Sequence, residues 1–128
     1  MSVLTIQRIL ASVFFVLGGW ALFFPNMVIE LGVNEPYRSD SYLETLLMAC
    51  FGAQAMIAGT FAWFSRFTKT TFIAYAIILL PFFGFNYWFV IREPVMNELM
   101  LIDLAGNVLM LYLCWLGWKK APARLRPA

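Results

Sequence analysis

The sequence predicts an all-α integral membrane protein, a four-helix bundle with both termini in the cytoplasm. Three observations lead to this fold class. Of the 128 residues, 62% are hydrophobic and only 12% are charged, whereas soluble domains carry roughly 45–50% apolar and about 25% charged residues. The chain contains four long apolar segments, and their connections are too short to hold a separate soluble domain. Basic residues gather on one side of these segments. We therefore expect a single transmembrane domain.

The first predicted span covers residues 3–24 and ends at Pro25. Gln7 and Arg8 are the polar residues near its start. A hydrocarbon core of about 30 Å requires about 20 helical residues, so this segment is long enough to cross. After it we expect a connection over residues 25–42.

A cleaved signal peptide is the alternative reading of this first segment. Arg8 followed by an apolar stretch and by the small residues Gly19 and Ala21 is typical of one. Hydrophobicity continues beyond that point through residues 22–24. We therefore expect the first span to be retained.

The second predicted span, residues 43–64, carries small residues at helical spacing. They are Gly52, Ala55, Gly59 and Ala62. Small residues allow helix backbones to approach closely in a membrane. Ala11, Gly18 and Gly19 of the first span offer a possible partner surface. The pattern is compatible with packing inside the bundle and with packing between subunits.

The third and fourth predicted spans cover residues 71–91 and 99–118, and a basic cytoplasmic tail covers residues 119–128. Short turns over residues 65–70 and 92–98 join the spans. Pro81 lies in the middle of the third span, where a missing backbone donor predicts a kink. The aromatic residues that follow Pro81 would then line an apolar pocket suited to a quinone, carotenoid or sterol-like tail, unless they pack against lipid.

The placement of charge predicts the orientation. Seven of the nine Lys and Arg residues fall on the N-terminal side of the predicted spans, and the other two are Arg38 and Arg92. The positive-inside rule then places both termini in the cytoplasm. Six of the seven acids fall on or near the opposite side. Aromatic residues form a belt at each level, where amphipathic rings favour the headgroup zone. The outer belt holds Trp20, Tyr37, Tyr42, Tyr87 and Trp88, and the inner belt holds Trp63, Trp115 and Trp118.

Polar residues inside the spans are the candidate ligand-binding residues, because each costs free energy unless it has a partner. At about 1.5 Å per residue, Gln54 lies about 15 Å, Asp103 about 6 Å, Asn107 about 12 Å and Asn86 about 8 Å from the outer end of its span. Asp103 and Asn107 are four residues apart and share one helix face. Glu44 and Arg92 lie at the same outer level. Together these six residues predict an outward-facing polar cavity.

The same residues also fit a purely structural role. Gln, Asn and Asp hydrogen-bond between membrane helices at about 0.6 kcal/mol per bond without any ligand. Asp103 is shallow enough to reach interfacial water or to pair with Arg92 across the outer turn. Both interpretations remain open at the level of the sequence.

Composition excludes several kinds of site. The chain has no histidine and two cysteines, Cys50 and Cys114, which lie in separate apolar runs. His-based metal centres, imidazole-dependent catalysis and a CxxC redox pair are therefore excluded, and no metal is expected. A phosphate-binding glycine loop is also missing, and the scattered basic residues give no argument for nucleic acid.

Two stretches carry a family resemblance. They are Gly18-Gly-Trp-Ala-Leu-Phe-Phe-Pro25, followed by Gly32, and Phe51-Gly-Ala-Gln-Ala-Met-Ile-Ala-Gly-Thr-Phe-Ala-Trp-Phe-Ser-Arg66. The chain resembles the small four-helix bacterial membrane proteins of the DoxX-like group. This resemblance implies a protein of the bacterial inner (plasma) membrane, in some members an accessory subunit beside quinone-linked oxidoreductases. It carries no catalytic motif onto residues of this chain.

The leading functional prediction is therefore a small non-catalytic membrane protein. It is either an accessory subunit or a protein that binds a lipophilic ligand such as a quinone or lipid, and its partners are membrane lipids, other membrane subunits or a second copy. The alternative is a small dimeric proton-coupled exporter, which needs a deep titratable carboxylate. A membrane oxidoreductase is the third possibility, and the sequence offers it no haem ligands, cysteine pair or nucleotide loop.

Overall fold

The computed structural model describes residues 1–125, and all their long elements are helices. The α-helices are α1 (Val3–Phe23), α2 (Pro25–Gly32), α3 (Tyr42–Phe64), α4 (Lys69–Asn86) and α5 (Leu101–Lys120). Short helical turns complete them: η1 (Glu35–Tyr37), the π-helical η2 (Tyr87–Arg92) and η3 (Glu98–Met100). The prediction of an all-α chain is confirmed.

Four helices are long and apolar enough to cross a membrane. They cover Val3–Phe23, Tyr42–Phe64, Lys69–Arg92 and Glu98–Lys120. These bounds agree with the predicted spans to within two residues at each end. The last span continues to Lys120, so the first two residues of the predicted tail belong to its final turn. Arg126, the last basic residue of the predicted tail, lies outside the described residues.

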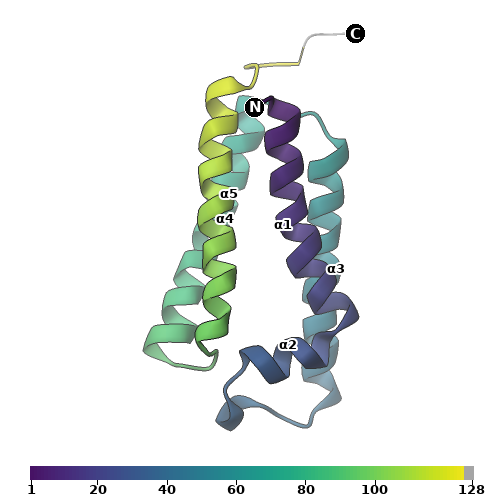
Figure 1. Ribbon diagram of the computed structural model, residues 1–128, viewed down its shortest axis with the longest axis vertical. Helices are drawn as coiled ribbons and strands as arrows, with labels where there is room; N and C mark the ends of the chain where they lie inside the picture. Colours follow the sequence, from purple (N-terminus) through teal and green to yellow (C-terminus); the bar gives the residue numbers. More distant parts are fainter. Residues whose placement is uncertain (126–128) are drawn as a thin grey trace.

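The four long helices form two antiparallel pairs. In Figure 1 α1 runs beside α3 and α4 runs beside α5, and the two pairs contact each other through α1 and α5. The start of α1 and the end of α5 lie at the same end of the structure, and α2 lies across the opposite end (Figure 1). We call these the terminal end and the α2 end.

Hydroxyl and amide side chains define where the long helices begin. Ser2, Ser41 and Thr68 each accept a hydrogen bond from a backbone N–H in the first turn of α1, α3 or α4. At the α2 end, Oδ1 of Asn97 accepts one from the Leu99 N–H, 2.9 Å away. These bonds satisfy donors that the helix itself leaves free.

Small residues bring the backbones of α1 and α3 together. A Cβ atom on Gly18 would lie 2.7 Å from the Ala55 Cβ, and one on Gly52 would meet backbone atoms of α1. The predicted small-residue surfaces therefore pack within one chain, between the first and second spans.

The main apolar core lies toward the terminal end, where α1, α4 and α5 meet. Ile6, Leu10, Phe72 and Cys114 are each at most 1% exposed there. The ring of Phe72 packs directly against Gly117, which leaves no room for a larger residue.

The connection over residues 25–42 is more ordered than the sequence suggested. Pro25 occupies the first turn of α2, where its missing N–H costs nothing and its fixed φ fits a helix. Val28, Ile29 and Gly32 are buried, so this short helix packs inward on one face. The periodic signal was too short to distinguish eight helical residues from a loop.

Candidate functional site

Three of the six candidate residues form one hydrogen-bonded group, Asn86–Asp103–Asn107. Oδ2 of Asp103 accepts a bond from Nδ2 of Asn86 and a second from Nδ2 of Asn107, each at 3.0 Å. Asn86 ends the regular part of α4, and the other two residues lie one turn apart on α5. The group therefore ties α4 to α5 near the α2 end.

Burial is uneven within this group. Asn107 is 2% exposed and Asn86 is 9% exposed, whereas Asp103 is half-buried. Nδ2 of Asn86 also donates to the Phe82 carbonyl at 2.9 Å, so both of its N–H bonds are used. Among the described residues, no buried side-chain polar atom lacks a hydrogen-bond partner. The second oxygen of Asp103 is thus open at the surface of the group.

The helix changes from α-helical to the wider π-helical winding directly after Asn86. η2 is a π-helical turn, and its end is marked by the Glu93 N–H donating to the Trp88 carbonyl, five residues back, at 2.7 Å. Single π-helical turns are uncommon and recur at functional sites. This turn carries α4 out to the α2 end beside the start of α5.

A network of amides fixes the start of α5 to α2. Nδ2 of Asn34 donates to the Pro94 carbonyl at 2.6 Å, and the Asn97 N–H donates to the Gly32 carbonyl at 2.9 Å. Nδ2 of Asn97 also donates to the Leu31 carbonyl. Val33 and Met96 form an isolated antiparallel bridge between the same segments. The helix that carries Asp103 is therefore held in position by the loop that follows α2.

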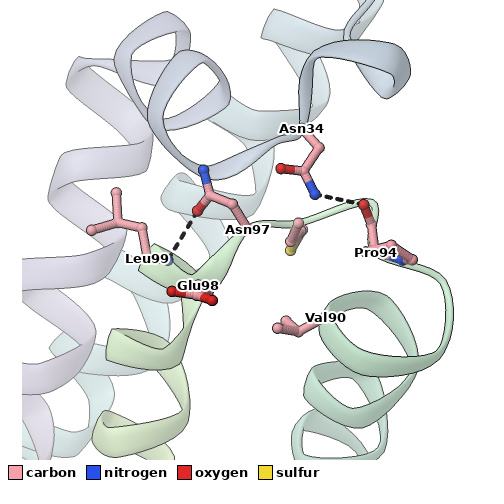
Figure 2. Close-up of a pocket in the computed structure, with 7 residues that line it drawn as sticks. Asn34, Val90, Pro94, Asn97, Glu98 and Leu99 are labelled. Atoms are coloured by element: carbon pink, nitrogen blue, oxygen red, sulfur yellow. Dashed lines mark hydrogen bonds between the residues drawn. The ribbon is translucent and has the colours of Figure 1, made fainter.

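A pocket of about 570 Å³ opens beside this network. Its lining residues are Asn34, Val90, Pro94, Met96, Asn97, Glu98 and Leu99. Figure 2 shows the amides of Asn34 and Asn97 bonded to the backbone at its rim. These amides thus serve the architecture of the α2 end, and the pocket was not predicted from the sequence.

The other three candidate residues do not join the group. Gln54 is exposed on α3. Oε2 of Glu44 accepts bonds from the backbone N–H and the hydroxyl of Ser39, both at 2.9 Å, in the loop before α3. The structure thus brings three of the six predicted residues together and leaves Gln54, Glu44 and Arg92 outside that group. Helix rotation explains this, since depth alone does not determine the direction of a side chain.

The sequence left open a pairing of Asp103 with Arg92, and the structure gives these two residues other contacts. The Arg92 guanidinium lies over the Trp88 ring, 4.2 Å from its centroid, and the bonds that Asp103 accepts come from the two amides. Pro81 lies inside α4, which continues to Asn86. Phe85 and Tyr87 are more than half exposed, so they lie on the outside of α4 rather than around a pocket shared with Asn86.

Gln7 is the polar residue that the sequence analysis missed. It is 2% exposed, and its Nε2 donates to the carbonyls of Ala62 and Ser65 at 3.1 and 2.7 Å. Oε1 accepts from the Phe67 N–H at 3.4 Å. Gln7 thus satisfies backbone groups at and beyond the end of α3, which is a structural role. In the sequence, Gln7 stands next to Arg8 and is typical of the polar edge of a span. Its burial, seen only in the structure, identifies its role.

Four of the tryptophans carry a cation on the ring face. Arg8 lies over Trp63 and Lys119 over Trp115, at 5.1 and 3.7 Å from the ring centroids. Lys69 lies 5.8 Å from the Trp118 centroid. These three pairs lie at the terminal end, and the Arg92–Trp88 pair lies toward the α2 end. The three tryptophans at the terminal end are those of the predicted inner belt, and Trp88 belongs to the predicted outer belt.

The described residues contain no group of three or more His, Cys, Asp or Glu side chains placed to hold a metal ion. Comparison of the chain with protein-family models, curated proteins and solved structures gives no match.

Proposed function

We propose that this chain is a non-catalytic integral membrane protein that holds the polar head of a lipophilic molecule, as an accessory subunit of a larger membrane complex. The observation that carries the proposal is the Asn86–Asp103–Asn107 group. It places a half-buried carboxylate, held by two amides, between two apolar helices long enough to span a membrane. Polar groups at such depth are costly and mark functional sites by default.

The free hydrogen-bonding positions of the group define the class of ligand. Both N–H bonds of Asn86 are used, and Asn107 retains one. The remaining positions are acceptors: the second oxygen of Asp103 and the two amide oxygens. A matching head group donates hydrogen bonds, as the hydroxyl of a quinol or the hydroxyl or ammonium group of a lipid does. A head group with only carbonyl oxygens, such as an oxidised quinone, fits less well.

The composition of the group favours binding over catalysis. It contains one carboxylate and two amides, and the chain has no histidine. The side chain that acts as general acid or base is most often a histidine, and this group offers a single carboxylate for that role. The group supplies charge and hydrogen bonds to a ligand, and an active partner subunit would supply any chemistry.

The proposed setting is the bacterial inner membrane, with both termini in the cytoplasm. The described terminal end carries Arg8, Arg66, Lys69, Lys119, Lys120 and Arg124, and the α2 end carries Arg38 and Arg92. Six acids lie at the α2 end: Glu30, Glu35, Asp40, Glu44, Glu93 and Glu98. This asymmetry supports the orientation through the positive-inside rule. The Asp103 site then faces the periplasmic half of the membrane.

The test is to purify the full chain in a mild detergent and to identify bound lipophilic molecules by organic extraction and mass spectrometry. Asp103→Asn is the informative variant. The oxygen of the new amide can still accept the bonds from Asn86 and Asn107, which leaves an N–H donor at the ligand position. The variant therefore keeps the fold but presents a hydrogen-bond donor to the ligand where Asp103 presents an acceptor. We expect the recovered ligand to fall about tenfold or more, the effect of losing a charged hydrogen bond.

Glu44→Gln is the matched control, because it neutralises another acid at the α2 end that does not join the group. Its ligand recovery should equal that of the unmodified chain. Equal recovery from Asp103→Asn, or a purified chain without any ligand, would overturn the proposal. Proton-driven transport in proteoliposomes that depends on Asp103 would instead favour the alternative function, a proton-coupled exporter.

A further inference from the structure

Gln54 lies in the middle of a membrane-length helix with its side chain exposed. It is twelve residues from Tyr42 and ten from Phe64, the two ends of α3. At 1.5 Å per residue, that is about 18 Å from the α2 end of the helix. α1 packs on the opposite face of α3, through Gly52, Ala55 and Gly59. Gln54 is therefore far from both ends of α3, and its exposed side chain does not face α1.

This position is unfavourable for a single chain in lipid. A primary amide has two donors and an acceptor that lipid tails cannot satisfy, and leaving them unpaired costs several kcal/mol in hydrocarbon. The neighbouring Thr60 avoids the problem because its hydroxyl donates to the Met56 carbonyl at 2.9 Å. Gln54 is longer and turns outward. A group outside the chain must supply its partner.

Exposed residues continue above and below Gln54 in a regular stripe, which we call the α3 stripe. Their spacing alternates between four and three residues along the whole of α3. The members, all exposed, are Leu43, Leu47, Cys50, Gln54, Ile57, Phe61 and Phe64. This is the heptad spacing of two helices that pack side by side with a left-handed crossing. Gln54 is the single amide of the stripe, at the position where one polar residue fixes the register of a helix pair.

We infer that the α3 stripe binds a second copy of this chain, in parallel orientation, with the two Gln54 amides hydrogen-bonded to each other. An amide is self-complementary, since its N–H donates to the oxygen of an identical amide. A two-fold axis along the membrane normal brings both copies of Gln54 to the same depth. A different protein would need its own polar side chain at that depth. This inference concerns α3 and is independent of the α4–α5 site.

Charge and shape are compatible with this pairing. None of the seven stripe residues is charged, so the pairing brings no like charges together. Ala53 and Ala58 flank Gln54 on the two sides of the stripe, and small residues allow close approach between membrane helices. The nearest acid, Glu44, is bonded to Ser39 in the preceding loop.

Cys50 provides the test, because it belongs to the stripe one turn from Gln54 while the other cysteine, Cys114, is buried. Membranes containing the full chain are treated with a short bifunctional maleimide, and the dimer band is quantified. We expect a Cys50-dependent dimer that Cys50→Ala abolishes and Cys114→Ala leaves unchanged. Gln54→Leu should lower the dimer fraction at least about threefold, the loss of one interhelical hydrogen bond. Gln54→Asn should lower it less.

Random collision is controlled by moving the thiol to α5, in the double variant Cys50→Ala with Val108→Cys. Val108 is 54% exposed and lies on a different helix. The dimer fraction of the double variant should therefore stay near background. The inference is overturned if this variant links as well as the unmodified chain, or if Gln54→Leu links as well as glutamine. It is also overturned if mass spectrometry shows Cys50 joined to a different protein.

Discussion

The side-chain amide of Gln7 donates a hydrogen bond to the main-chain oxygen of Ser65, which lies 2.7 Å away and 58 residues further along the chain. The same amide nitrogen reaches the Ala62 carbonyl, and its oxygen reaches the Phe67 N–H. One buried residue of α1 thus satisfies backbone groups at the end of α3 and in the turn that leads to α4. The end of a helix buried without such partners is costly.

Gln7→Leu should therefore destabilise the fold. Leucine fills a similar volume but leaves the two carbonyls and the N–H without their partner, and an unsatisfied buried group costs about 1–3 kcal/mol. We expect a loss of at least about 2 kcal/mol in the free energy of unfolding, measured by SDS titration in mixed micelles. The same exchange at the exposed Gln54, in excess detergent that separates copies, should change it by less than about 0.5 kcal/mol. Equal effects at both positions would contradict the role of Gln7.

Gly52→Ala should separate α1 from α3. The added Cβ would lie 2.6 Å from the Gly18 carbonyl oxygen and would also meet the Leu22 N. Backbone cannot move aside as a flexible side chain does, so we expect a loss of about 1–3 kcal/mol. Gly84→Ala is the matched control, because nothing lies within 4 Å of its added Cβ. It should gain about 0.5–1 kcal/mol from helix propensity, and a similar loss at both glycines would contradict the close contact.

The bond between Asp103 and Asn107 should appear as a coupling energy in ligand-free protein. Asp103→Ala and Asn107→Ala each remove it, so the double variant should lose less stability than the sum of the two single variants. We expect a coupling of about 0.5–1.5 kcal/mol. SDS unfolding of the four proteins in the cycle measures it. Additive losses would show that the two residues contribute independently.

Arg38 should order the loop that follows α2. Its Nε donates to the Val33 carbonyl at 2.8 Å and its Nη2 to the Glu30 carbonyl at 2.6 Å. Arg38→Ala frees both carbonyls at the end of α2, at a cost of about 1 kcal/mol, or roughly fivefold in local opening. Limited proteolysis over residues 33–41 should quicken by about that factor. Arg38→Lys keeps the charge but loses the two-point contact, so its rate should fall between the two; unchanged rates in both variants would contradict this role.

The orientation of the chain can be read with reporter fusions. A fluorescent protein that matures only in the cytoplasm should be bright when fused after the last residue. Alkaline phosphatase, which is active only outside the cytoplasm, should be active when inserted after Ser39, between η1 and α3. A dark C-terminal fusion or an inactive insertion would reverse the orientation expected from the placement of Lys and Arg.

Much of the helical layout could be predicted from composition and periodicity, because a span needs only length and apolar content. The small residues of α3 were recognised from their spacing, and the structure added that Gly18 is their partner in the same chain. α2 could not be predicted, since its eight residues are too few for a clear helical period. It is held by a local bond from Arg38 to Glu30 and by a bond from Asn97, which is 66 residues from its partner Leu31.

The candidate site was predicted only in part, for a related reason. Asp103 and Asn107 are four residues apart, so helical geometry alone placed them on one face, and Asn86 joined them because α4 packs on α5. Gln54 also lies inside a predicted span, but its side chain is exposed on α3 and does not face α4 or α5. Rotation of a uniformly apolar helix depends on packing, and the sequence contains little information about it.

The contacts of Gln7 have a consequence for biosynthesis. All three of its hydrogen-bond partners lie between residues 62 and 67, and the contact of Gly18 with Gly52 precedes them in the chain. The α1–α3 pair is thus fully specified by roughly the first half of the polypeptide. As the N-terminal part of a chain leaves the ribosome first, the groups that form these contacts emerge before those of α4 and α5. The α4–α5 pair then completes the core against a surface that is already in place.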